Sequence, residues 1–197
     1  MIAIFDYGAG NLRSVANTLE EVGAPYRIVN GEAGLRSASK IILPGVGHYG
    51  QMLAALDRIQ VREPLREALR AGVPFLGICL GLQALFEAGE EAPEQSGLGI
   101  FPGVVRRFPA SVRIPQMGWN LIEIRRGSRL LAGLGPKPYF YFAHSYYAPI
   151  IPQAAATCTY AVAYTAAIEA GNIYAVQFHP EKSGPLGLKV MRNFVEL

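Results

Sequence analysis

The sequence predicts an α/β fold in which a mostly parallel central sheet is flanked by helices and carries an antiparallel extension. In the first half, short apolar runs alternate with stretches of helical periodicity, which is the pattern of βαβ units. After Pro93 the chain changes to successive strand-like runs. Its 197 residues, 51% of them hydrophobic, suit one ordinary domain with a sizeable core, so we expect a single domain over 1–197.

The first half predicts alternating strands and helices. Residues 2–6 form an apolar run that leads into a glycine-rich turn, and Asn11 can cap a helix over 12–22 whose apolar residues share one face. The other elements expected here are strands over 25–29, 40–43 and 73–78 and helical segments over 51–56, 64–69 and 81–88.

The second half is expected to consist mainly of strands. Ala170-Gly171-Asn172 has the composition of a hairpin turn, and the last segment, 185–195, has a helical pattern. The strand-like runs lie over 103–108, 120–124, 138–142, 155–163 and 173–178.

Composition argues against several classes of protein. The net charge is only +3 and the basic residues are scattered, so we expect no nucleic-acid partner. No apolar stretch approaches the roughly 18 residues of a membrane span, and the N-terminus has the pattern of a first strand rather than a signal peptide. Cys79 and Cys158 could form one disulfide, but two reduced thiols in a cytoplasmic protein are the favoured interpretation.

The segment Gly77-Ile78-Cys79-Leu80-Gly81 joins a predicted strand to a predicted helix and has the form glycine–x–nucleophile–x–glycine. This is the context of a nucleophile elbow, in which the glycines permit a sharp turn that projects the side chain from the sheet. The N-terminus of the following helix can stabilise a thiolate and a developing oxyanion. These five residues alone leave a buried, inert cysteine as an equal alternative.

A second segment, Gln177-Phe178-His179-Pro180-Glu181, places a histidine and a carboxylate two residues apart after a predicted strand. A cysteine nucleophile needs a base that takes its proton and later protonates the leaving group. That base needs an orienting partner, as in the Ser-His-Asp triad. The two segments together predict an enzyme with Cys79 as nucleophile, His179 as acid/base and Glu181 as the orienting carboxylate.

A glycine-rich segment after the third predicted strand has two interpretations. Gly45–Gly50 matches the dinucleotide-binding pattern Gly-x-Gly-x-x-Gly, but the next convincing strand ends in Cys79 and not in the acidic residue that this fingerprint requires. We instead expect the N–H groups near Val46 and Gly47, with that of Leu80, to form an oxyanion hole. One such donor is typically worth about 3–4 kcal/mol in the transition state.

Neither a metal nor a cofactor is expected. The three histidines, His48, His144 and His179, show no ligand spacing with cysteines or carboxylates. The run Phe140–Tyr146, which contains His144, has the pattern of an apolar strand with a polar end, and the residues alone assign it no role.

Taken together, Gly-Ile-Cys-Leu-Gly-Leu-Gln at 77–83 and His-Pro-Glu at 179–181 resemble the motifs of the class I (triad) glutamine amidotransferase family. The resemblance implies a class I glutamine amidotransferase-like α/β fold and a glutaminase that releases ammonia from glutamine. It also implies substrate contacts from Gln83 and from the backbone of Ser145 and Tyr146, and an oxyanion strand over Pro44–Gly47. The sequence departs from the family pattern at no catalytic position.

Within the family, five further segments resemble the stand-alone glutaminase subunits that serve histidine biosynthesis. This branch implies a heterodimer with a (β/α)8-barrel cyclase subunit, which receives ammonia through a sheltered channel. It also implies a glutaminase that is nearly idle until its partner binds substrate, so the Pro44–Gly47 peptide groups can point the wrong way in the free subunit. The segments are 6–11, 44–47, 116–120, 141–146 and 178–183.

Three other functions remain as alternatives. The first is a glutaminase of the same family with another acceptor, in anthranilate, guanylate, carbamoyl phosphate or pyridoxal phosphate synthesis; segments 6–8 and 117–119 disfavour it. The second is a free-standing thiol hydrolase for γ-glutamyl peptides, which would be fully active alone. The third is a non-catalytic binding module, which the complete Cys79, His179 and Glu181 set disfavours.

Overall fold

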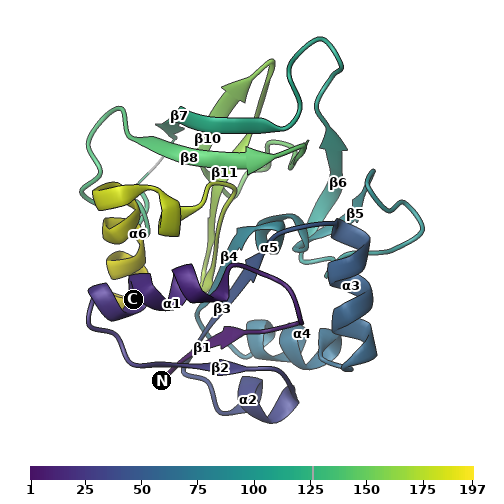
Figure 1. Cartoon of the computed structure of the whole chain (residues 1–197), viewed down its shortest axis with the longest axis vertical. Coiled ribbons are helices and arrows are strands. Elements are labelled where there is room, and N and C mark those ends of the chain that lie inside the picture. Colours follow the sequence, from purple (N-terminus) through teal and green to yellow (C-terminus); the bar gives the residue numbers. More distant parts are fainter. Residues whose placement is uncertain (126) are drawn as a thin grey trace.

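The computed structural model describes residues 1–125 and 127–197, and within them nine strands form one large mixed sheet (Figure 1). The strand order is β2-β1-β3-β4-β12-β11-β10-β7-β8. Neighbours from β2 to β12 pair in parallel, and those from β12 to β8 pair antiparallel. The predicted fold class, a parallel sheet with an antiparallel extension, is therefore confirmed. The strands are β1 (Ile2–Phe5), β2 (Tyr26–Val29), β3 (Lys40–Gly45), β4 (Phe75–Cys79), β7 (Gln116–Ile124), β8 (Tyr139–His144), β10 (Ala154–Tyr160), β11 (Val162–Ala170) and β12 (Ile173–Val176).

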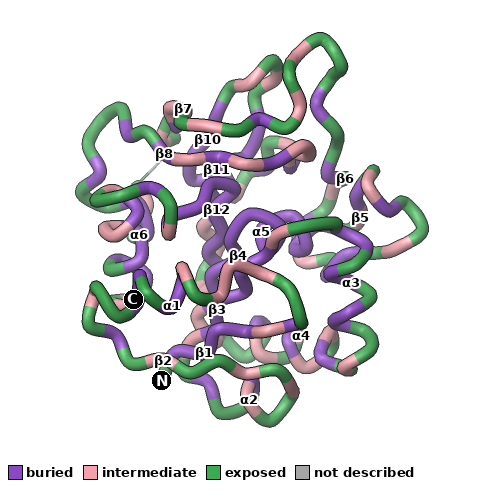
Figure 2. Tube along the Cα trace, in the orientation of Figure 1, coloured by how far each residue is buried: buried purple, intermediate pink, exposed green. Residues whose placement is uncertain are grey.

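Helices cover both faces of the parallel strands (Figure 1). Successive residues of β1 point to opposite faces, as a strand requires. Phe5 accordingly packs in one buried cluster with Leu53 of α3, and Ile4 packs in a second cluster with Leu19 of α1 and Phe194 of α6. Burial on both faces explains why the central strands are almost continuously apolar (Figure 2). The helices are α1 (Leu12–Glu21), α2 (Glu32–Arg36), α3 (Tyr49–Arg58), α4 (Arg62–Arg70), α5 (Leu80–Gln83), the 3-10 turn η1 (Pro180–Lys182) and α6 (Gly184–Glu196).

A second, smaller sheet was not predicted. It pairs β5 (Phe86–Gly89) with β6 (Phe101–Arg107) in parallel, and β6 with β9 (Tyr146–Tyr147) antiparallel. The helix expected over 81–88 is therefore wrong in its second half, since α5 ends at Gln83. Pairing with β6, in which Phe86 lies opposite Phe101, decides the conformation of residues 86–89 against their local helical pattern.

The strand expected over 155–163 is in fact a hairpin. The chain reverses between β10 and β11 at Ala161, whose φ is 59°, and β11 continues to Ala170. The predicted turn at 170–172 is confirmed, because Ala170 pairs with Ile173 across β11 and β12. Within the described part of the chain, no helix has the length and apolar character that crossing a membrane requires.

Candidate active site

Cys79 lies at the sharp turn between β4 and α5, with φ 54° and ψ −104°. A non-glycine residue rarely adopts positive φ, so the surrounding packing must hold this conformation. The two flanking glycines allow that packing. A Cβ at Gly77 would lie 2.6 Å from the carbonyl oxygen of Gly81, and one at Gly81 would lie 2.1 Å from that of Leu43. The elbow therefore has the geometry that its glycine spacing predicts.

His179 and Glu181 follow β12, the strand that pairs with β4, so they lie beside Cys79. The Nδ1 atom of His179 is 2.8 Å from Oε1 of Glu181, and these side chains are only 3% and 1% exposed. The carboxylate accepts the Nδ1 proton, which leaves Nε2 for the sulfur of Cys79, a neighbour close enough to raise the pKa of His179. The structure thus brings the three residues predicted as a triad into one chain of contacts.

The electrostatics of this cluster favour a charged imidazole. Burial opposes the charge on His179, but the neighbouring Cys79 thiolate and the Glu181 carboxylate together raise the pKa of His179 to about 10. An imidazolium beside the sulfur stabilises a thiolate, which is the reactive form of a cysteine nucleophile. The arrangement can therefore attack an electrophilic carbon and then supply a proton to the leaving group.

The predicted oxyanion strand lies beside the elbow, because Gly45 of β3 pairs with Cys79. Val46, Gly47 and Leu80 all line the cavity in front of the sulfur. The N–H of Val46, however, donates to the hydroxyl of Tyr7 at 3.3 Å. In this conformation that N–H is already engaged and is not free to stabilise an oxyanion.

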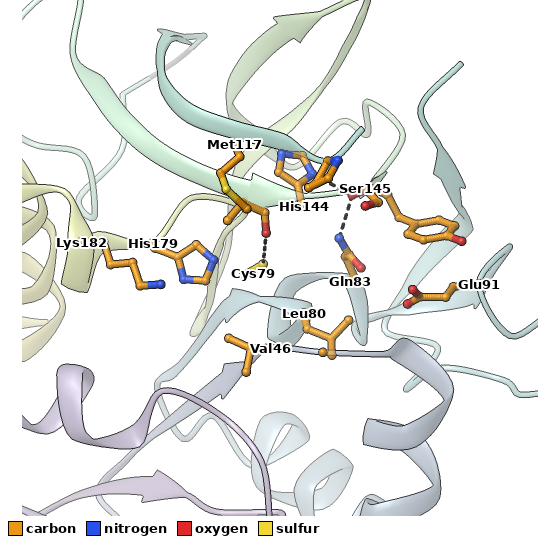
Figure 3. Close-up of a pocket in the computed structure, with 14 residues that line it drawn as sticks. Val46, Cys79, Leu80, Gln83, Glu91, Met117, His144, Ser145, His179 and Lys182 are labelled. Atoms are coloured by element: carbon orange, nitrogen blue, oxygen red, sulfur yellow. Dashed lines mark hydrogen bonds between the residues drawn. The ribbon is translucent and has the colours of Figure 1, made fainter. Parts of the chain in front are cut away.

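A cavity of about 320 Å³ opens over Cys79 (Figure 3). The predicted substrate residues Gln83, Ser145 and Tyr146 line it, and the Nε2 of Gln83 donates to the Tyr146 carbonyl at 2.8 Å. Figure 3 shows His179 on one side of Cys79 and Gln83 on the other. A volume of this size suits one small molecule.

A family model for "Glutamine amidotransferase class-I" matches residues 3–197. The chain belongs to the class I glutamine amidotransferase family. It is an enzyme of that family, a glutamine amidotransferase. Among curated relatives, "Imidazole glycerol phosphate synthase subunit HisH" of Deinococcus radiodurans is 47% identical, over 98% of this chain and 92% of the relative. The protein of the same name from Methanothermobacter thermautotrophicus is 49% identical, over 100% and 98% of the two chains.

Solved structures confirm the amidotransferase fold. "Structure of PurLQS from Thermotoga maritima" contains a chain with a TM-score of 0.77 and 21% identity to this amidotransferase. The match covers 99% of this chain and 97% of the other. A second solved structure, titled "Crystal structure of glutamine amidotransferase", has a TM-score of 0.76 at 20% identity and the same coverage of both chains.

The sequence did not point to Glu91 as a residue of the amidotransferase site. Glu91 follows β5 and reaches the cavity on the same side of Cys79 as Gln83 (Figure 3). Its Oε2 accepts the backbone N–H of Tyr49 at 2.7 Å, which fixes the carboxylate. In the sequence the pair Glu90-Glu91 looks like an ordinary solvated turn, so only the pairing of β5 with β6 reveals its position. A carboxylate there can bind the ammonium group of an amino acid.

Met117, His144 and Lys182 also line the cavity without having been predicted there. Burial lowers the pKa of His144 to about 4, so the ring is neutral. Its Nδ1 lies 2.8 Å from the Tyr146 carbonyl and must carry the proton, because a carbonyl only accepts. His144 therefore supports the backbone to which Gln83 binds. Cys79 and Cys158 are both free and buried, so no disulfide joins them.

Proposed function

We propose that this chain is the glutaminase subunit of an imidazole glycerol phosphate synthase, acting in histidine biosynthesis. It hydrolyses glutamine to glutamate and ammonia and passes the ammonia to a cyclase subunit. The observation that carries the choice of pathway is the identity of 47–49% with proteins of that name over almost the whole of both chains. The triad geometry alone supports only glutamine amidotransfer, since other members of the family share this chemistry.

We propose the following roles for the triad. The thiolate of Cys79 attacks the side-chain carbonyl of glutamine and forms a tetrahedral intermediate. His179 gives its proton to the departing ammonia, which leaves a γ-glutamyl thioester. His179 then takes a proton from water, and the resulting hydroxide hydrolyses the thioester to glutamate. Glu181 holds the imidazole in the tautomer that these steps need, which its 2.8 Å contact with Nδ1 supports.

The proposed glutamine site uses both ends of the cavity. Gln83 and the backbone of Ser145 and Tyr146 hold the substrate near the sulfur, and Glu91 receives its α-ammonium group. Lining of the cavity by all four residues supports this orientation. The oxyanion would be held by the N–H groups of Leu80 and of the Val46–Gly47 segment, once the Val46 N–H no longer donates to the Tyr7 hydroxyl.

The partner that we propose is a (β/α)8-barrel cyclase subunit, which binds this chain as a heterodimer. Ammonia becomes protonated in open water and then loses its nucleophilic lone pair, so its transfer requires a covered passage. Met117 lines the cavity and is 67% exposed, and nearby Trp119 is 57% exposed. Large apolar side chains exposed beside a reactive site suit a surface that a partner covers.

We further propose that residues 1–197 act as a single glutamine amidotransferase domain in the cytoplasm. The match of the family over 3–197 supports the single domain, and the two free cysteines support a reducing compartment.

Glutamate release from glutamine tests the proposal. We expect little activity from the purified chain alone and a large increase with the barrel cyclase and its ribotide substrate. Complementation of a histidine auxotroph tests the pathway independently. High activity alone, unchanged by the cyclase, would instead indicate a free-standing γ-glutamyl hydrolase or the subunit of another synthase.

A further inference from the structure

Gln177 is a fully buried polar residue that contacts the nucleophile. It lies just after β12 and two residues before His179, and it is 0% exposed. Its Nε2 lies 3.6 Å from the sulfur of Cys79, and its Oε1 accepts a hydrogen bond from Nε2 of Gln83 at 3.1 Å. One amide thus joins the reacting atom to a residue of the proposed glutamine site.

The orientation of this amide follows from the groups around it. The carbonyl of Tyr146 can only accept, so Gln83 must turn its NH₂ group toward it. The same NH₂ group also faces Gln177, which must therefore present its oxygen to Gln83. The NH₂ group of Gln177 is then left on the other side, where the sulfur of Cys79 lies. The Tyr146 carbonyl consequently fixes the direction of the hydrogen bonds from Gln83 to Gln177 and from Gln177 to Cys79.

The backbone around Gln177 is also fixed. Its N–H donates to the carbonyl of Ala166 on β11 at 2.9 Å. The neutral His144 donates a second hydrogen bond to the Tyr146 carbonyl, which keeps that acceptor in place. A buried amide in such a fixed setting loses little by reorganisation when charge develops beside it.

We propose that Gln177 is a further catalytic residue of the glutaminase, which donates a hydrogen bond to the Cys79 thiolate and holds Gln83 ready for substrate. The proposal rests on the proposed role of Cys79 as nucleophile. The side-chain N–H of Gln177 and the imidazole of His179 both stabilise the sulfur anion, whereas the Ala143 carbonyl oxygen, 4.0 Å from the sulfur, can only accept a hydrogen bond and so favours the thiol. By taking one N–H of Gln83, Gln177 also leaves the Gln83 carbonyl oxygen free to accept from the substrate.

Gln177→Met tests this role, because methionine keeps the length of the side chain and removes both its donor and its acceptor. The measurement is the rate at which iodoacetamide alkylates Cys79 in the full chain, as a function of pH. Every protein compared, including the reference, also carries Cys158→Ser, so that Cys79 is the only thiol. Losing one hydrogen bond to the anion should move the midpoint of this profile up by about one pH unit and slow alkylation about tenfold below it. The other titratable groups near the sulfur are unchanged in all variants. They are His179 with Glu181, Tyr7 and Tyr164, together with Glu91, His144 and Lys182 of the cavity lining.

Gln177→Glu is the matched variant that keeps the acceptor for Gln83 but places a carboxylate beside the sulfur. It should raise the midpoint further than methionine does. In the complex with the cyclase, both variants should lose at least about tenfold in kcat for glutamine, while synthesis from added ammonia stays at the wild-type rate. A purely structural role would lower the melting temperature and leave the alkylation midpoint unmoved.

Gln83→Met keeps the proposal testable if neither variant at 177 folds. It removes the group that orients Gln177, so a smaller upward shift of the same midpoint is expected. Unchanged profiles in the folded variants would overturn the role of Gln177. A wild-type complex that uses ammonia but not glutamine would instead overturn the proposed function on which it rests.

Discussion

The hydroxyl of Tyr7 lies 3.3 Å from the backbone nitrogen of Val46 and 3.4 Å from its carbonyl oxygen. Tyr7 is buried, and burial raises the pKa of its phenol to about 12, so the group stays protonated and can both donate and accept. Val46 also lines the cavity over Cys79. The Tyr7 side chain therefore holds the backbone N–H of Val46, which an oxyanion over Cys79 would need as a hydrogen-bond donor.

Tyr7→Phe should raise the glutaminase activity of the isolated chain. The variant removes the acceptor for the Val46 N–H, and a neutral hydrogen bond is worth about 1 kcal/mol, which corresponds to about fivefold in rate. Glutamate release without cyclase measures it, and Tyr7→Phe combined with Cys79→Ala is the control for contaminating activity. A basal rate equal to or below that of the wild type would show that Tyr7 does not restrain the oxyanion strand.

Cys79→Ala should abolish the use of glutamine and leave ammonia-dependent synthesis by the complex intact. Without the sulfur no thioester forms, so glutamate release should fall by on the order of 10⁴-fold or more. The cyclase reaction with added ammonium salt is the internal control, because it needs the partner but not the thiol. If the variant complex still hydrolysed glutamine, another residue would be the nucleophile.

The parts of the site that the sequence predicts are those that depend on short spacings. The elbow needs one glycine two residues before Cys79 and another two residues after it. A Cβ at Gly77 or at Gly81 would collide with a backbone carbonyl oxygen. His179 and Glu181 are two residues apart, so a single turn places one against the other. Such local constraints are visible in a sequence because they act on neighbouring residues.

The parts that could not be predicted depend on long-range pairing. Residues 86–89 have a helical pattern but pair with β6, and this brings Glu91 to the cavity. The alanine-rich run 163–167 belongs to β11, which pairs with β10 on one side and with β12 on the other. Its own residues carry no strong strand signal. Gln177 reaches the sulfur of Cys79 across 98 positions of sequence, a contact that no spacing rule contains.

Cys158→Ser should cost little glutaminase activity. Cys158 is buried on β10, and burial raises the pKa of its thiol, so it is a protonated and poorly reactive group. We expect kcat to stay within about twofold of the wild type, with a melting temperature lower by a few degrees, because a hydroxyl replaces a weakly polar thiol in the core. A severe loss of kcat in a folded variant would assign Cys158 a role in the reaction.

The neutral state of His144 predicts how stability depends on pH. The pKa of His144 is lowered from 6.5 to about 4 in the folded chain because the ring is buried, so the unfolded chain binds more protons between these values. Stability from this residue is therefore complete above about pH 6.5 and is lost as the pH falls toward 4. Between pH 7.5 and pH 5 the loss from this one group should be about 2 kcal/mol.

His144→Asn isolates that contribution, because the asparagine amide can still donate to the Tyr146 carbonyl but does not titrate. Measured in urea, the free energy of unfolding of the wild type minus that of the variant should rise by about 2 kcal/mol between pH 5 and pH 7.5. His179 acts in the opposite direction, because its raised pKa makes its stabilisation complete below about pH 6.5 and removes it progressively as the pH rises from there toward 10. Both proteins carry His179, so its contribution cancels in the difference between them. Parallel curves for the two proteins would show that His144 takes up its proton in the folded chain as readily as in the unfolded one.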